Sequence, residues 1–92
     1  MTTWYRRHQD LRLTALEGEG VALHLGSRRY FTVSETGLVI LEALKTPATF
    51  DTLVGEIVAH YDIDPERAAE SVRAFLDRCV GAGLVVAEER PA

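Results

Sequence analysis

Few side chains in this chain could act as nucleophiles, general bases or metal ligands. They are three histidines, His8, His24 and His60, and one cysteine, Cys79. The histidines are scattered along the chain, and none has the spacing of a metal site or of a nucleophile with its base. Cys79 falls in an apolar helical stripe, where a buried structural thiol is the more common role. We therefore expect no catalytic residue, no metal and no cofactor.

Backbone chemistry is the more informative signal, and it is concentrated in residues 28–44, RRYFTVSETGLVILEAL. Aromatic and β-branched residues at 29–33 favour a strand. Ser34 is a good N-cap, and leucines follow at helical spacing. A strand runs directly into a helix here. If that strand lies at a sheet edge, its N–H and C=O groups can pair with another peptide strand. We expect this edge to be the functional site.

Two further strands are predicted before this one. Apolar and polar residues alternate over 11–15 and again over 21–25, which is the period of a half-buried strand. Glycine-containing turns are expected at 17–20 and 26–27, and the third strand covers 30–33. Short connections favour antiparallel neighbours, so the predicted sheet is a three-stranded meander.

Three helices are predicted after the sheet. The first covers about 35–45 and stops before Pro47. The second begins after Thr49, a suitable N-cap. The third begins near Asp64-Pro65, where Asp64 is the expected cap and Pro65 suits the first helical position, and ends at Gly81. The expected fold class is α+β and winged-helix-like, with a three-stranded antiparallel N-terminal sheet followed by three helices.

Length and composition predict one folded domain over residues 1–92, because 47% of the residues are apolar and 26% are charged. We expect a loose arm at 1–10, a short strand or extended tail at 84–86, and a frayed tail at 88–92. The net charge of −4 is the wrong sign for a broad phosphate-binding surface. No stretch is apolar enough for a membrane span or a secretory signal, so we expect a cytoplasmic location and neither membrane nor nucleic acid as a partner.

Three segments together resemble the PqqD-like family of peptide-recognition elements: LHLGSRRYFTVSETGLVILEAL, TFDTLVGEIVAHYDID and SVRAFLDRCVGAGLV. The resemblance covers residues 11–86. It rests on the aromatic pair Tyr30-Phe31, the polar opening of the first helix and the apolar spacing of the third. As a short chain with an RRYF strand, it is most similar to the stand-alone leader-binding proteins of lasso-peptide clusters. Two departures are Ser34, where relatives often have Asn, and Cys79, where Leu is common.

The resemblance implies capture of the leader segment of a ribosomally made precursor peptide. The leader would add as an antiparallel strand to the third strand, in a groove against the third helix. In lasso pathways the leader typically carries a Tyr-x-x-Pro motif, and a separate cysteine protease removes it. The resemblance therefore implies this protease as a partner, with the cyclase as a further one, and a role in binding without catalysis.

The predicted peptide-binding residues come from the third strand and the third helix. Phe31 and Val33 should point toward the helices, and Tyr30 and Thr32 away from them. On the helix, Phe75 and Cys79 are assigned mainly to the core. The full predicted set is Arg28, Arg29, Tyr30, Phe31, Thr32, Val33, Val72, Arg73, Leu76, Asp77 and Val80.

Two other functions agree with the predicted architecture. A DNA-binding winged helix would place the third helix in a groove of the duplex. That helix carries the carboxylates of Glu66, Glu70 and Asp77 among its arginines, which disfavours a phosphate-lined site. An adaptor that binds other proteins without a leader peptide is the second alternative, with Trp4 and Tyr5 as candidate surface residues.

Overall fold

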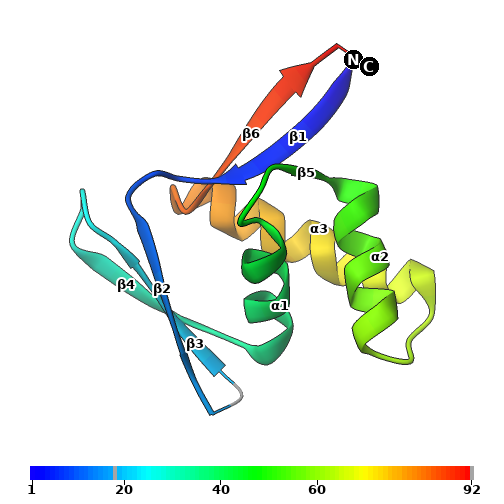
Figure 1. Ribbon diagram of the computed structural model, residues 1–92, viewed down its shortest axis with the longest axis horizontal. Coiled ribbons are helices and arrows are strands. Elements are labelled where there is room, and N and C mark those ends of the chain that lie inside the picture. The colour runs from blue at the N-terminus through cyan, green and yellow to red at the C-terminus, as the bar shows by residue number, and fades with distance from the viewer. Residues whose placement is uncertain (18, 92) are drawn as a thin grey trace.

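The computed structural model describes residues 1–17 and 19–91, which form two small antiparallel sheets and three helices (Figure 1). The first sheet has the order β2-β3-β4, with β2 at Leu11–Leu16, β3 at Glu19–His24 and β4 at Arg29–Val33. This is the predicted meander, and the α+β class with three helices is confirmed. The turn predicted at 17–20 includes Gly18, which lies outside the described residues.

The second sheet, with the order β5-β1-β6, was not predicted as a sheet, although a short strand or extended tail was expected over 84–86, where β6 begins. It contains β1 at Thr2–Arg7, β5 at Ala48–Thr49 and β6 at Val85–Arg90. β1 pairs with β6 in antiparallel register from Thr2↔Arg90 to Arg7↔Val85. The prediction of a loose arm over 1–10 is therefore wrong for the residues in β1. The prediction of a frayed tail from 88 is wrong as far as Arg90.

Polar cross-strand contacts explain why these two charged segments form a ladder. The Arg6 guanidinium binds the Glu88 carboxylate, which also accepts a hydrogen bond from Arg90 at 3.3 Å. The Thr3 hydroxyl donates to Glu89 at 2.6 Å. Opposite charges and hydroxyl groups on facing strands stabilise a pair, although the segments lack the apolar alternation that marks a strand in sequence.

The three helices begin at the predicted caps. α1 is Glu35–Ala43, α2 is Phe50–His60 and α3 is Pro65–Gly81. Each N-cap side chain accepts a backbone N–H from the first turn: Ser34 from Gly37 at 3.2 Å, Thr49 from Thr52 at 3.3 Å, and Asp64 from Glu66 at 3.4 Å. α1 ends two residues before the predicted Lys45. After α3, Gly83 takes a φ of 77°, a left-handed conformation that suits glycine and turns the chain back toward β6.

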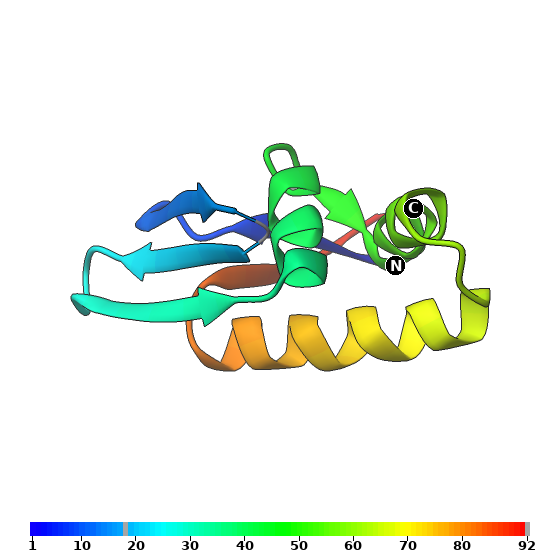
Figure 2. The ribbon, with the colours of Figure 1, turned by 90° about the horizontal axis from the view of Figure 1, so that it is seen from below.

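One apolar core joins the helices to both sheets. α1 lies between the β2-β3-β4 sheet and α2, and α3 runs along one side of the molecule from α2 to that sheet (Figure 2). Each helix contributes fully buried side chains, and β3 and β4 add one residue each. The core consists of Tyr5, Leu11, Ala22, Val33, Ile40, Leu41, Leu44, Ala48, Leu53, Ile57, Ala68, Val72, Leu76, Cys79, Leu84 and Val85.

The two chain ends lie next to each other, at the tip of the ribbon formed by β1 and β6 (Figure 1). The β2-β3-β4 sheet extends away from this tip on the other side of α1. Across residues 1–17 and 19–91, no helix is both long and apolar enough to cross a bilayer.

Candidate functional site

The candidate site is the outer edge of β4. In the order β2-β3-β4, this strand pairs with β3 on one side only, through Gly20↔Val33 to His24↔Arg29. The side chains alternate as predicted: Val33 is buried and Phe31 is half-buried against the core, whereas Tyr30 is 74% exposed and Thr32 is exposed. An edge strand of this kind presents a row of N–H and C=O groups for pairing.

Phe75 of α3 lies near the end of this strand. Its ring and Val33 both approach Gly37, the buried glycine in the first turn of α1. The Arg78 guanidinium sits 5.9 Å from the centre of the Phe75 ring, and the Arg29 guanidinium sits 5.6 Å from that of Phe31. β4, the start of α1 and the last turns of α3 therefore form a strip with two aromatic rings, each contacted by an arginine.

A small hollow opens at the end of this strip, with a volume of about 190 Å³. It lies between the N-terminal turn of α1 and the adjacent face of α3. Its lining is mostly polar and consists of Ser34, Thr36, Gly37, Ile40, Ser71, Phe75 and Arg78. A guest strand on β4 would have this hollow at one end.

Comparison of the sequence with known protein families identifies the family of this chain. The family described as Coenzyme PQQ synthesis protein D (PqqD) matches residues 19–85, which include β3, β4 and all three helices. The chain belongs to the PqqD family. No curated protein matches it.

A solved structure with the same fold is titled "TbiB1 in Complex with the TbiA(beta) Leader Peptide". It has a TM-score of 0.79 and 23% sequence identity to this chain. The alignment covers 95% of this chain and 99% of that one. At this identity the likeness establishes a shared fold.

In this PqqD-family chain, two predicted groove residues belong to the core. Val72 and Leu76 are both 0% exposed, so the prediction that they line the groove is wrong. The helical stripe that faces α1 and α2 passes through them, and their burial leaves no surface for a guest peptide. Cys79 is in the core as predicted, whereas Phe75 is only half-buried and lines the polar hollow.

Two other predicted residues on α3 face away from β4. Arg73 donates to the Tyr5 hydroxyl at 2.9 Å, stacks over Phe50 at 4.3 Å, and lies 3.9 Å from Asp77. These contacts hold Arg73 and Asp77 toward β1 and α2. Val80, near the end of α3, is 41% exposed, but it lies seven residues after Arg73 and therefore on the same face of the helix as Arg73, away from Phe75.

The strip contains two residues of α3 that sequence reasoning missed, Ser71 and Arg78. Phe75 packs against the core, as predicted, but it also lines the hollow, which was not predicted. The spacing of four and then three places Ser71, Phe75 and Arg78 on one face of α3. That spacing is visible in the sequence, but the face carries one apolar residue between two polar ones. Apolar periodicity alone directs attention to Val72 and Leu76 instead.

The exposed surface of α3 carries both signs of charge. Glu66, Glu70 and Asp77 are exposed together with Arg67 and Arg78. A recognition helix lying in a DNA groove would bring these carboxylates close to phosphates, which is unfavourable. The structure therefore gives no support to the DNA-binding alternative.

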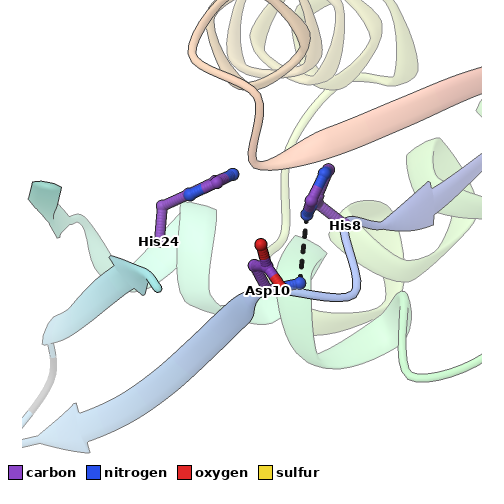
Figure 3. A group of neighbouring side chains, drawn as sticks. All are labelled: His8, Asp10 and His24. Atoms are coloured by element: carbon purple, nitrogen blue, oxygen red, sulfur yellow. Dashed lines mark hydrogen bonds between the residues drawn. The ribbon is translucent and has the colours of Figure 1, made fainter. Parts of the chain in front are cut away.

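Two histidines that the sequence separates come together at the corner between the two sheets (Figure 3). The ring centroids of His8 and His24 are 4.7 Å apart, and Asp10 lies beside them with one ligand atom from each residue within 4.8 Å of the others. The expectation of scattered histidines is wrong for this pair. His60 stays apart, at the end of α2.

The hydrogen bonds in this corner favour a structural role. Nδ1 of His8 accepts the Asp10 N–H at 3.0 Å, and Nδ1 of His24 accepts the Ser27 N–H at 3.1 Å. In a neutral imidazole whose Nδ1 accepts, Nε2 carries the proton. In each ring, Nδ1 then accepts a backbone hydrogen bond and Nε2 carries a proton, so neither ring has a lone pair free for a metal ion. A metal ion could bind only by displacing one of these backbone hydrogen bonds. The contact between the two rings holds the β1–β2 corner against the β3–β4 turn.

A second hollow of about 540 Å³ lies between α1 and α2. α1 contributes Leu38, Val39, Glu42 and Ala43 to it, whereas Gly37 and Ile40 face the polar hollow beside α3. The two hollows therefore lie on different faces of α1, and this one does not adjoin β4.

Proposed function

We propose that this protein captures the leader segment of a ribosomally made precursor peptide, which adds as an antiparallel strand to β4 and lies against α3. The observation that carries the proposal is the edge position of β4 beside the Phe31–Phe75 strip, in a chain of the PqqD family. The structure of TbiB1 with a leader peptide, which shares this fold, supports the proposal.

The free energies of the expected contacts indicate that most of the specificity for a peptide comes from side-chain contacts. A guest strand on 29–33 would form about four main-chain hydrogen bonds, each worth about 0.5–1.5 kcal/mol net. Association and ordering of a flexible leader cost at least about 4 kcal/mol. Burial of one aromatic or aliphatic anchor adds roughly 1.5–3 kcal/mol. Backbone pairing therefore positions the peptide, and contacts with Phe31 and Phe75 supply the additional affinity.

The proposed pathway is lasso-peptide maturation in the cytoplasm. The leader carries a Tyr-x-x-Pro motif, and the captured peptide is presented to a leader-cleaving cysteine protease and then to the cyclase. The chain itself acts by binding, without catalysis. Of the predicted site residues, we retain Arg28, Arg29, Tyr30, Phe31, Thr32 and Val33, and add Ser71, Phe75 and Arg78.

The test is a titration of the leader segment encoded beside this gene, labelled with a fluorophore and followed by anisotropy. We expect saturable one-to-one binding with a dissociation constant between nanomolar and micromolar. Absence of saturable binding would remove leader capture as the function.

Hydrogen exchange locates the bound strand. With the leader present, amide exchange should slow at Arg29–Val33. β2, the other edge of the same sheet at Leu11–Leu16, is the internal control and should not change. Slowing confined to β2, or equal slowing at both edges, would contradict strand addition at β4.

A further inference from the structure

Three arginines gather around the β4 edge without a carboxylate partner. Arg28 lies in the turn just before β4, Arg29 begins the strand, and Arg78 lies beyond its other end; all three are exposed. Elsewhere, Arg6, Arg73, Arg90 and Lys45 each lie within 4.0 Å of a carboxylate, whereas Arg7, Arg12 and Arg67 have no such pair among the described residues, so it is the position beside β4 that sets the three arginines apart. Within residues 1–17 and 19–91, no ion pair includes Arg28, Arg29 or Arg78. This local excess of positive charge contrasts with the net charge of −4.

Two of these arginines are held in place by aromatic rings of the strip. The Arg29 guanidinium lies 5.6 Å from the Phe31 ring centre, and that of Arg78 lies 5.9 Å from the Phe75 ring centre. A cation near a ring is attracted to its face and loses less freedom when it then binds an anion. Both guanidinium groups are thus positioned before any peptide arrives.

The surroundings of Arg78 suit a carboxylate. The hollow of about 190 Å³ beside it is also lined by the side chains of Ser34, Thr36 and Ser71, each of which carries a hydroxyl group. Guanidinium and hydroxyl groups are the donors that bind carboxylates in proteins. Glu35 begins α1 next to this hollow but is not among the residues that line it.

Resting on the proposed function, we propose that the captured peptide is acidic: one carboxylate binds at Arg78 in the hollow and a second binds at Arg29. Four residue steps separate Arg29 from Val33, or roughly 14 Å along a strand. The two acidic residues should therefore be four to six positions apart in the peptide. An even separation places both on the same face of the added strand.

The test is selection from a random library of twelve-residue peptides displayed on phage, with the full chain as bait. Binders should be enriched in Asp or Glu at two positions four to six residues apart. One selected peptide is then resynthesised with each acidic residue changed to its amide. The wild-type chain should lose roughly tenfold in affinity for each change, as expected for hydrogen bonds to charged groups.

The double variant Arg29→Gln/Arg78→Gln should bind the acidic and amide peptides equally. Arg12→Gln, at an exposed position on β2, the opposite edge of the sheet, is the matched control and should keep the full preference. Thermal unfolding of each variant checks that the fold is intact. A single-site variant, Arg78→Lys, should keep part of the preference because the charge remains while bidentate geometry is lost.

The outcomes separate this inference from the proposed function. Binders without acidic enrichment, or an acidic preference that survives Arg29→Gln/Arg78→Gln, would overturn the inference and leave peptide capture intact. In another outcome, the encoded leader binds while no peptide selected from the library competes with it. That outcome also counts against acidic recognition. If no library peptide binds and the encoded leader does not bind either, both proposals are wrong.

Discussion

The ring of Phe75 lies against Gly37 so closely that a Cβ on this glycine would come within 2.6 Å of the ring atom Cε1. The same Cβ would come within 2.8 Å of Val33 Cγ1. Gly37 is therefore a point at which β4, α1 and α3 approach closely, and it sets the position of Phe75 in the strip.

We expect Gly37→Ala to destabilise the protein by about 1–3 kcal/mol, because the methyl group overpacks the contact. It should also weaken leader binding by displacing Phe75. Gly55→Ala on α2 is the matched control, since nothing lies within 4 Å of its Cβ position. It should raise stability by up to about 1 kcal/mol through helix propensity. Urea unfolding measures both, and equal effects would show that Gly37 has no packing role.

Proline at Tyr30 or Thr32 removes one N–H donor from β4. Proline is tolerated on an edge strand where that N–H faces outward, so the fold should persist there while the guest strand loses a hydrogen bond. We expect weaker leader binding by anisotropy, with unchanged far-ultraviolet circular dichroism. Unchanged affinity at both positions, with the fold intact, would point to a binding site elsewhere.

Burial raises the pKa of the Cys79 thiol to about 11, and the charge of Arg78 only partly opposes this. The raised value means that the folded state holds this proton more tightly than the unfolded state, whose pKa is 9.0. The stabilising contribution is therefore complete below pH 9 and is lost as the pH rises toward 11. Iodoacetamide at pH 7.5 should react with Cys79 far more slowly in native protein than in urea. Equal rates would show that the thiol is accessible.

The pKa of Glu88 is lowered by hydrogen bonds from Arg6 and then Arg90. A lowered carboxyl pKa contributes stability above the unfolded value of 4.5, and that contribution is lost as the pH falls through the folded value. Glu88→Gln should therefore narrow the difference in melting temperature between pH 7 and pH 3. Glu19→Gln, at an exposed position in β3, is the control and should leave the pH dependence unchanged. An identical pH profile for wild type and Glu88→Gln would contradict the β1–β6 contact.

Sequence patterns identified the elements whose burial follows a regular period. The alternation in β2, β3 and β4 and the caps at Ser34, Thr49 and Asp64 were all read correctly. The direction of Phe31 and Val33 also followed from the alternation, since Val33 is buried and Tyr30 is exposed.

Sequence patterns failed where pairing depends on residues far apart in the chain. β1 and β6 pair through charged and hydroxyl side chains. Neither segment alternates enough to show the whole strand, and only the apolar residues at 84–86 indicated where β6 begins. Likewise, His8 and His24 meet because of the β1–β2 corner and the β3–β4 turn, which no local spacing reveals. On α3, Val72 and Leu76 were assigned to a groove because a helical stripe does not say which neighbour covers it.

Because Thr2 pairs with Arg90, the chain can be closed into a ring by a short glycine-serine linker across the tip of the β1–β6 ribbon. A circular permutant with new ends opened in the exposed turn at Gly26-Ser27 would then place a fluorophore or a surface tether next to β4 rather than remote from it. The start of β1 and the end of β6, which lie together on the far side of α1, are suitable attachment points for immobilising this domain with the β4 edge unobstructed.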